Sequence, residues 1–384
     1  MKHWRMVWAL LMAWPLSPAT AQPEPRTLAT VVVDPPAGLG AGFVRASRHL
    51  LARPDGSVDA TIAWEAEESG SKAPTKVELV RIGKDAALLK EVTLATGQEL
   101  GGEPRGPFQM ASGEMVVYVF SDEPQNSYGS LLHLSAEGDR LKTMRLIFQP
   151  PPEVLKHYPK MEYAFSLAFD LRDGSVIVGG NGSCPFSSWW GRLAHNGTRV
   201  ADSGSIKQGV PCDVAAGRAE PDGGFSLVVA EVNWKDGGTA DLWLHRYDAR
   251  GTRTLYRKLV DHTVGPAAFY GDEIVVFGWK DSQLRVFDAK GGPIRQLPWD
   301  GQTIWRLDAD PKGYLMIVDD NDEKAQIFRN RVVRCDRNGV VLWRSSKGHF
   351  IDAVLAPDGS VWTVARTPPG GSNGKWTFQR FADP

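Results

Sequence analysis

The chain has 384 residues, a formal net charge of −1 and a charged fraction of 23%. Such balanced charge gives no electrostatic basis for binding nucleic acid or an anionic membrane surface. The length alone allows two or three domains, whereas 40 glycines and 14 tryptophans suit many short strands joined by tight turns.

The first residues predict a secretory signal peptide rather than a buried N-terminal helix. A basic start at Lys2–Arg5 precedes an apolar run at Met6–Trp14 and a small-x-small cleavage site that ends at Ala21. The run is too short to cross a bilayer, which takes about 20 apolar residues. We therefore expect residues 1–21 to be removed, and the mature chain to be periplasmic or secreted and without a membrane span.

One pattern recurs along the mature chain: an apolar run, a polar turn centred on glycine, and a second β-branched run. The copies lie about 40 to 60 residues apart, a spacing typical of propellers and solenoids. Third and fourth strands follow, joined by their own Asp/Asn-Gly turn, and four antiparallel strands make one propeller blade. The glycines of the first turns are Gly56, Gly113, Gly174, Gly223, Gly271, Gly313 and Gly359.

Counting the units predicts an all-β fold, a seven-bladed β-propeller over residues 22–384, with six or eight blades also possible. The last unit begins at Phe350 and has three strands, of which the third is Trp376–Phe381. A lone β-branched strand at 28–33 precedes the first full unit, which begins near Gly42. We expect this strand to complete the last blade and close the ring, because closure removes exposed strand edges.

A proline-rich insertion at 148–163 lengthens the interval between the second and third units. It is either a tolerated surface loop, since doubling a loop's length costs only about 0.6 kcal/mol, or a lid or contact loop over one end of the ring.

Two segments carry a resemblance to known proteins. Asp173–Gly180, followed by Gly191–Thr198, resembles the blade repeat of bacterial exported propellers of the NHL-like and quinoprotein-like groups. Asp336–Trp343 resembles the Asp-x-x-Gly-x-x-x-Trp docking segment of quinoprotein blades, which occurs clearly once here. The resemblance implies an exported β-propeller and specifies no activity, and no quinone or other cofactor is predicted.

The sequence contains no catalytic signature. The eight histidines occur singly, and there is no nucleophile elbow, phosphate-binding glycine loop or dinucleotide fingerprint. The acidic run at 319–323 lacks the glycine and the distant glutamate of a calcium loop, which favours a solvated turn. Ligands from several blades can still converge at a channel mouth. A metal-dependent hydrolase or lactonase with unknown ligands is therefore the alternative function.

The loops between second and third strands, and those that link blades, share one face of a propeller. Here they carry aromatic residues of the kind enriched at protein interfaces and able to stack on sugars, although each tryptophan could instead seal a gap between blades. We interpret the set as the protein-binding face of a monomeric, non-catalytic scaffold, with an immunity or inhibitor protein as one version and a polysaccharide as the less favoured ligand. The candidate residues are Tyr128, Trp189, Trp190, Trp234, Trp279, Trp299, Asp122 and Glu123.

The three cysteines agree with export. Cys184 and Cys212 both fall on the expected loop face. A disulfide between them would close a loop of about 28 residues and stabilise the fold by roughly 3 to 4 kcal/mol. Cys335 alternates with Val333 along a strand and is predicted to be a small buried side chain.

Overall fold

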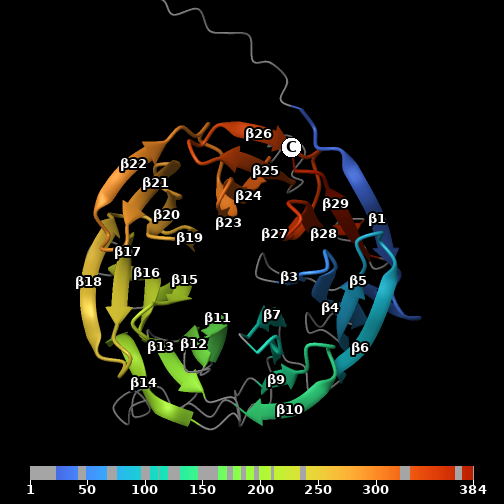
Figure 1. The fold of residues 1–384 in the computed structure, drawn as a ribbon, viewed down its shortest axis with the longest axis horizontal. Helices are drawn as coiled ribbons and strands as arrows, with labels where there is room; N and C mark the ends of the chain where they lie inside the picture. Colours follow the sequence, from blue (N-terminus) through green and yellow to red (C-terminus); the bar gives the residue numbers. More distant parts are fainter. Residues whose placement is uncertain are drawn as a thin grey trace, which may run out of the picture.

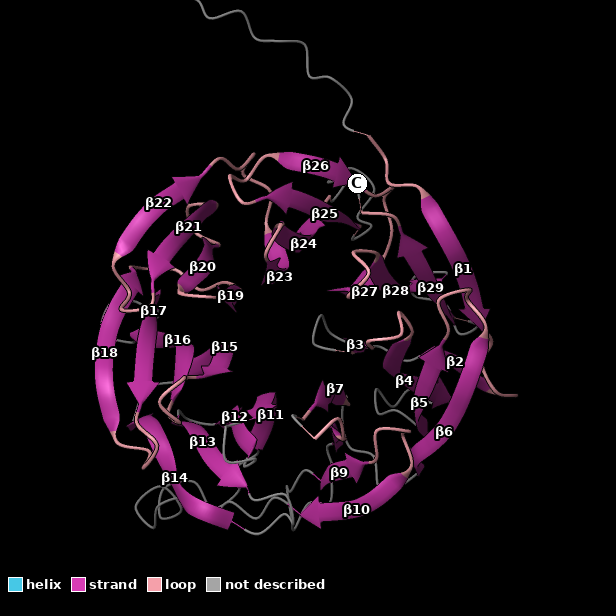
Figure 2. Ribbon diagram, in the orientation of Figure 1, coloured by secondary structure: helices cyan, strands magenta, loops and turns pink. Residues whose placement is uncertain are grey.

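The computed structural model of the chain describes most of its length between Pro23 and Asp383. The described ranges are 23–41, 49–66, 76–96, 104–110, 112–119, 130–145, 163–170, 176–182, 187–193, 199–208, 212–233, 239–320, 329–367 and 374–383. All regular structure in these ranges is β-strand (Figure 2). No helix in the described part of the chain is long and apolar enough to cross a membrane.

The strands of the described ranges form seven antiparallel sheets, numbered here in chain order. Sheet 1 contains β2 (Leu39–Ala41), β3 (Leu50–Ala52), β4 (Val58–Ala66), β5 (Lys76–Ile82) and β6 (Leu88–Thr96). Sheet 2 contains β7 (Arg105–Gln109), β8 (Met115–Val119), β9 (Ser130–Leu134) and β10 (Arg140–Arg145). Sheet 3 contains β11 (Tyr163–Asp170), β12 (Val176–Gly182), β13 (Ser187–Leu193) and β14 (Arg199–Gln208).

The remaining sheets follow the same plan. Sheet 4 contains β15 (Cys212–Ala219), β16 (Phe225–Asn233), β17 (Thr239–Tyr247) and β18 (Arg253–Val260). Sheet 5 contains β19 (Ala267–Tyr270), β20 (Glu273–Gly278), β21 (Gln283–Asp288) and β22 (Pro293–Leu297). Sheet 6 contains β23 (Ile304–Asp310), β24 (Gly313–Asp319), β25 (Asn330–Asp336) and β26 (Val341–Arg344). Sheet 7 contains β27 (Phe350–Leu355), β28 (Val361–Thr367), β29 (Lys375–Phe381) and β1 (Thr27–Val33).

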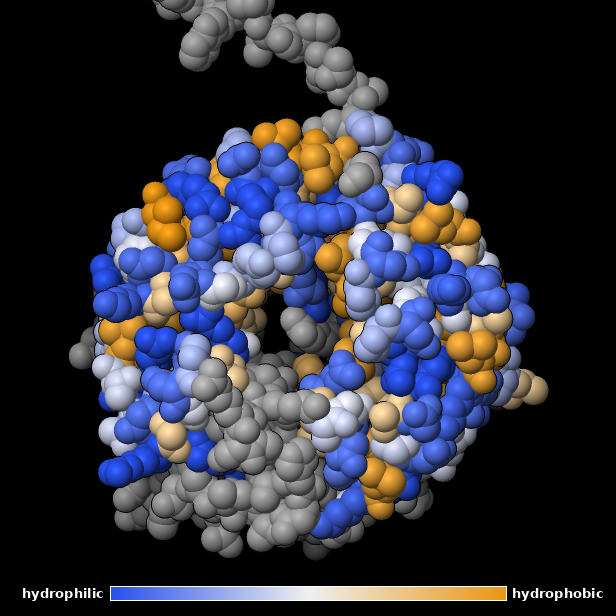
Figure 3. Space-filling view, in the orientation of Figure 1, coloured by the Kyte–Doolittle hydropathy of each residue, from blue (hydrophilic) through white to orange (hydrophobic). Residues whose placement is uncertain are grey.

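The sheets stand around a central opening (Figure 1). The first strand of each unit, from β3 and β7 to β27, lies nearest the opening, and β6, β10, β14, β18, β22, β26 and β1 lie on the rim. This is the arrangement of a β-propeller. On the face seen in Figure 3, mainly hydrophilic side chains surround a hollow at the centre.

The first strand pairs with the last one. β1 lies antiparallel to β29, with Val33 opposite Trp376 and Thr30 opposite Gln379. The two segments that the sequence analysis placed together, 28–33 and 376–381, are therefore neighbours in sheet 7. Sheet 1 differs from the expected four strands, because β2 and β3 both pair with β4, one along each half of it.

Side chains of sheet 7 reach into sheet 1. The indole of Trp362 donates to the carbonyl of Gly56 at 3.0 Å, and that of Trp376 donates to the carbonyl of Ala63 at 3.1 Å. Both rings belong to one buried apolar cluster that continues through sheet 1 into sheet 2. The contact joins the two ends of the described chain through a packed core.

The predicted hairpin turns are present where the structure describes them. Gly56, Gly223 and Gly359 have φ angles of 83°, 86° and 85°, a left-handed conformation that favours glycine. In the turns of Gly56 and Gly359 a preceding aspartate, Asp55 or Asp358, accepts a hydrogen bond from the following serine amide at 3.0 Å. The turn predicted at Gly174 lies outside the described residues.

A basic residue recurs at one position of the third strand in six of the seven described sheets. Where a glycine turn follows the third strand, the basic residue lies five residues before that glycine, as His133 does before Gly138. In the sheets without this glycine, it lies at the equivalent position of the third strand. In most cases it reaches a carboxylate beside the first hairpin turn of the same sheet, as Arg81 reaches Asp59 at 2.7 Å. In sheet 5 Val286 takes the position. The basic residues are Arg81, His133, Arg192, Arg246, Arg334 and Arg380.

Several predictions fall on residues that are not described. The signal peptide at 1–21 and the insertion at 148–163, except Tyr163, lie outside the described residues. So does the Cys184–Cys212 disulfide, apart from the backbone of Cys212. Cys335 is a buried free cysteine in β25, as predicted.

Candidate functional site

Most of the predicted loop-face residues lie outside the described part of the chain. These are Tyr128, Trp234, Asp122 and Glu123, and Trp189 is described only as part of the β13 backbone. The structure therefore locates three of the eight side chains: Trp190, Trp279 and Trp299.

Trp190 lies within a strand and is buried, which is the alternative that the sequence analysis left open for each tryptophan. It belongs to β13, is 3% exposed, and packs against Phe225 and Tyr247 with ring centroids 4.9 and 5.5 Å apart. A methyl group on Gly251 would lie 2.5 Å from the indole, so this glycine leaves room for the ring. Trp190 seals the gap between sheets 3 and 4.

Trp299 lies in the linker between sheets 5 and 6 and is half-buried. Its indole donates to the carbonyl of Gln302 at 2.6 Å, and the guanidinium of Arg344 lies 5.9 Å from the ring centroid. It packs against the apolar cluster shared by sheets 5 and 6. The contacts of Trp299 therefore fix the linker in place and leave little of its ring available to a binding partner.

Trp279 is exposed, and the structure pairs it with a tryptophan that the sequence analysis missed. Trp279 follows β20 and is 37% exposed, while Trp305, the second residue of β23, is 45% exposed. Their ring centroids lie 5.1 Å apart at an angle of 61°, an edge-to-face contact. The Trp279 indole donates to the carbonyl of Ile304 at 2.8 Å and so crosses from sheet 5 to sheet 6.

Regular alternation along β23 would not have identified Trp305 as an exposed residue. Trp305, Leu307 and Ala309 alternate with polar residues, so a regular strand would place these three on one face. Trp305 is nevertheless exposed, whereas Leu307 is buried. The pairing of β23 with β24 shifts its register between Ile304 and Arg306, so side chains on the two sides of this irregularity do not follow one alternation.

Asp319, at the end of β24, completes the site. Its half-buried carboxyl group has a pKa raised by burial, and a hydrogen bond from Trp305 offsets this only in part. We name Trp279, Trp305 and Asp319 the tryptophan–aspartate patch.

Asp319 differs from the acids near it in the sequence. Asp281 pairs with Arg285, Asp300 with Arg344, and Asp320 with Arg331 and Lys347. Within the described ranges, no lysine or arginine lies at ion-pair distance from Asp319, so its charge is not compensated there.

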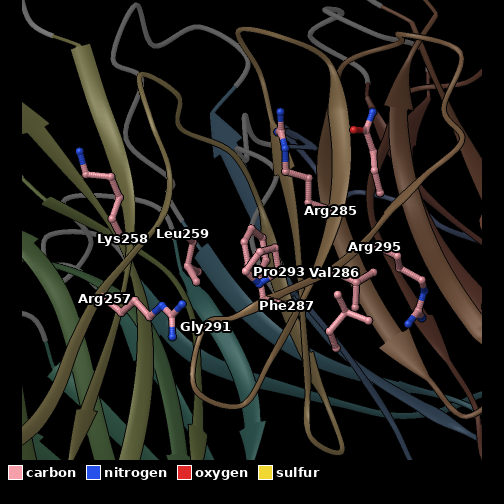
Figure 4. A pocket seen from close by; sticks show the side chains of 11 residues that line it. Arg257, Lys258, Leu259, Arg285, Val286, Phe287, Gly291, Pro293 and Arg295 are labelled. Carbon is pink, nitrogen blue, oxygen red and sulfur yellow. The ribbon is translucent and has the colours of Figure 1, made fainter.

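A groove of about 420 Å³ between the rims of sheets 4 and 5 is a second candidate (Figure 4). Leu259, Phe287 and Ile294 contribute apolar surface, and four cations line it without a lining acid. Three of the cations pair with carboxylates just outside: Lys258 with Asp241, Arg285 with Asp281, and Arg295 with Glu273. Because most of its charge is neutralised, the groove is a weaker anion site than its lining suggests.

The described residues contain no group of three or more His, Cys, Asp or Glu side chains that could hold a metal ion. The buried acids instead serve as partners within and between sheets. Glu231 contacts the buried His245 at 3.0 Å and accepts a hydrogen bond from Tyr256 at 2.8 Å.

No protein-family model and no curated protein matches the chain. It is similar to the β-propeller domain of the Trilobed protease from Pyrococcus furiosus, at 10% identity and a TM-score of 0.55, over 89% of this chain and 100% of that one. It is also similar to a chain of the Mitotic Checkpoint Complex, at 14% identity and a TM-score of 0.51, over 98% and 100% of the two chains.

A third similar structure is the acylaminoacyl peptidase of Pyrococcus horikoshii, at 8% identity and a TM-score of 0.53, over 90% of this chain and 52% of the peptidase. The chain thus spans about half the length of that enzyme. Likenesses at these identities show the β-propeller fold and carry no activity.

Proposed function

We propose that the protein is an exported, non-catalytic scaffold that binds another protein through the face that contains the tryptophan–aspartate patch. The observation that carries the proposal is the exposed Trp279–Trp305 pair. Tryptophan is enriched at protein interfaces and dominates their binding energy. Two neighbouring rings that are 37% and 45% exposed retain much apolar surface for a partner to cover.

The anchoring of both rings supports a preformed contact. Trp279 is fixed through its indole to Ile304, and Trp305 through its hydrogen bond to Asp319. A side chain that is already ordered loses less rotamer entropy when a partner binds, which improves affinity without a new contact.

For the architecture we propose seven blades, one for each sheet, in a ring that β1 closes. The pairing of β1 with β29 and the indole hydrogen bonds from sheet 7 to sheet 1 support this closure. A closed ring protects its strand edges and agrees with a monomer.

We propose export through the signal peptide at 1–21, to the periplasm or beyond. That compartment permits the Cys184–Cys212 disulfide. One specific version of the function is an immunity or inhibitor protein that caps a toxin.

The test is affinity capture from the cell envelope fraction with the mature protein as bait. We expect one protein to be captured, and the double variant Trp279→Ala/Trp305→Ala to reduce its recovery at least tenfold, because hot-spot tryptophans contribute about 2 kcal/mol or more each. The control is Ile294→Ala, which removes an exposed apolar side chain of the rim strand β22 that is not part of the patch.

Equal capture by the wild type and the double variant would show that this face is not the contact. Metal analysis of the mature protein tests the competing proposal, a metal-dependent hydrolase or lactonase. Stoichiometric metal without a captured protein would favour that enzyme.

A further inference from the structure

We infer that the tryptophan–aspartate patch binds a cationic group, the guanidinium or ammonium of an arginine or lysine side chain that the partner protein inserts between Trp279, Trp305 and Asp319. This inference rests on the proposed function and adds the chemistry of the partner. It identifies the patch as a site for one side chain rather than a general apolar contact.

The first argument is the uncompensated carboxylate. The acids next to the patch in the sequence, Asp281, Asp300 and Asp320, already have arginine or lysine partners. Asp319 is held by the indole of Trp305, a neutral donor, and has no cationic neighbour among the described residues. A half-buried carboxylate in this situation gains most from a cation supplied by another molecule.

The second argument is the arrangement of the rings. The face of an indole carries negative charge density and attracts a cation placed within about 6 Å of the ring centroid. In an edge-to-face pair one ring presents its edge to the other, so the exposed faces point in different directions and enclose a corner. Trp305 donates a hydrogen bond to Asp319, and from this contact we infer that the carboxylate and the ring faces attract the same cation.

The chain uses this chemistry internally on sheets 4, 5 and 6. The guanidinium of Arg337 lies 4.7 Å from the ring centroid of Tyr270 and also pairs with the carboxylate of Glu273. The ammonium of Lys258 lies 5.1 Å from the centroid of Trp243 and pairs with Asp241. In each case one cation is shared by an aromatic face and an acid. The patch has the aromatic and acidic members of this arrangement, and no described residue supplies the cation.

A sugar is the other occupant that stacked tryptophans suggest. Neutral sugars stack on indole faces through C–H groups, and their binding does not require a charged carboxylate. The two occupants therefore differ in one measurable property, the dependence of binding on the charges of the ligand and of Asp319.

The experiment is fluorine NMR on the protein labelled with 5-fluorotryptophan, with the resonances assigned through Trp279→Phe and Trp305→Phe. The probes are N-acetyl-arginine amide, its uncharged counterpart N-acetyl-citrulline amide, and cellotriose. We expect the arginine amide to shift both resonances saturably, with a dissociation constant on the order of millimolar. Citrulline amide and cellotriose should bind at least tenfold more weakly.

Asp319→Asn is the decisive variant, because the amide oxygen can still accept the hydrogen bond from Trp305 while the charge is lost. We expect it to weaken binding of the arginine amide at least fivefold and to leave the unliganded spectrum close to that of the wild type. Equal binding of arginine and citrulline amides, an unchanged affinity in Asp319→Asn, or preferred binding of cellotriose would each overturn the inference.

Partner capture separates this inference from the proposed function. If Trp279→Ala/Trp305→Ala abolishes capture and Asp319→Asn preserves it fully, the partner binds the patch without a cation and only the inference fails. If neither variant reduces capture, the proposed function fails as well.

Discussion

The carboxylate of Asp352 accepts a hydrogen bond at 2.7 Å from the backbone amide of His49, a residue 303 positions earlier in the chain. The same oxygen accepts a second hydrogen bond, at 2.9 Å, from the amide of Leu50. The other oxygen lies 3.3 Å from Nε of Arg306 on sheet 6. One buried side chain thus connects sheets 6, 7 and 1, where the end of the chain meets its beginning.

This position predicts a large effect of Asp352→Ala on stability. The substitution removes the acceptor of three buried amides, those of His49, Leu50 and Ala353. It also leaves Arg306 without one of its two carboxylate partners. We expect the free energy of unfolding to fall by about 3 kcal/mol, measured by urea denaturation. The control is Asp272→Ala in an exposed turn, which should stay within about 0.5 kcal/mol of the wild type. A similar small effect of both substitutions would mean that Asp352 does not stabilise the contact between these sheets.

Substitution of Arg334 tests how much the recurring basic residue contributes to the free energy of unfolding. Its side chain is fully buried, with Nη2 2.7 Å from Asp310 and Nε 3.3 Å from Asp383. Arg334→Met should cost about 3 to 5 kcal/mol, because it leaves both acids without their buried cation. Arg250→Met, in an exposed turn, is the matched control in the same denaturation experiment. If the two variants unfold at the same urea concentration, the buried pairs contribute nothing net.

The local strand and turn patterns could be predicted from the sequence, whereas the long-range contact of Asp352 could not. The strands and their glycine turns follow from local rules, alternation of polarity and backbone conformation, so 28–33 and 376–381 could be placed side by side. The Asp352–His49 contact depends on the register between strands 303 positions apart, which no local pattern encodes. The arginine–carboxylate pairs repeat at a fixed distance from the turn glycines and were predictable in principle from the repeat.

The candidate site was only partly predictable, for a similar reason. Trp279 could be found because it follows a strand and enters a loop. Trp190 is the central residue of β13, and its burial depends on the neighbouring sheet, which the local sequence does not encode. Trp305 could not be identified from alternation, because the register of β23 shifts between Ile304 and Arg306. Asp319 required knowledge of which acids already have partners.

We expect protonation of Glu220 to contribute to the loss of folding stability at acidic pH. Burial alone would raise its pKa, but hydrogen bonds from Ser226 and Arg246, each at 2.5 Å, and from Arg218 outweigh it, so the pKa lies below its usual 4.5. At pH values between the lowered pKa and 4.5, Glu220 therefore binds more protons in the unfolded state than in the folded state. Stability from this group is complete above pH 4.5 and is lost as the pH falls through the folded pKa.

The measurement is the urea midpoint of wild type and Glu220→Gln at a series of pH values from 6 to below 4. Glu220→Gln should be less stable at pH 6, because a neutral amide makes weaker hydrogen bonds with the two arginines. Its midpoint should fall less steeply on acidification, so the two curves converge. Parallel curves over the whole range would contradict the lowered pKa.

The burial of Cys335 predicts how many thiols react in the native and in the unfolded protein. The same count tests the proposed disulfide. The side chain is buried, and burial raises the pKa of its thiol to about 12. At pH 8 only about one molecule in ten thousand then carries the reactive thiolate, so the native protein should not react with an alkylating reagent. If Cys184 and Cys212 form a disulfide, the protein purified from an oxidising compartment and unfolded without reductant should react at one thiol per chain, and Cys335→Ala at none. Three reactive thiols in the unreduced, unfolded chain would rule out the disulfide, whereas rapid reaction of the native protein at Cys335 would contradict its burial.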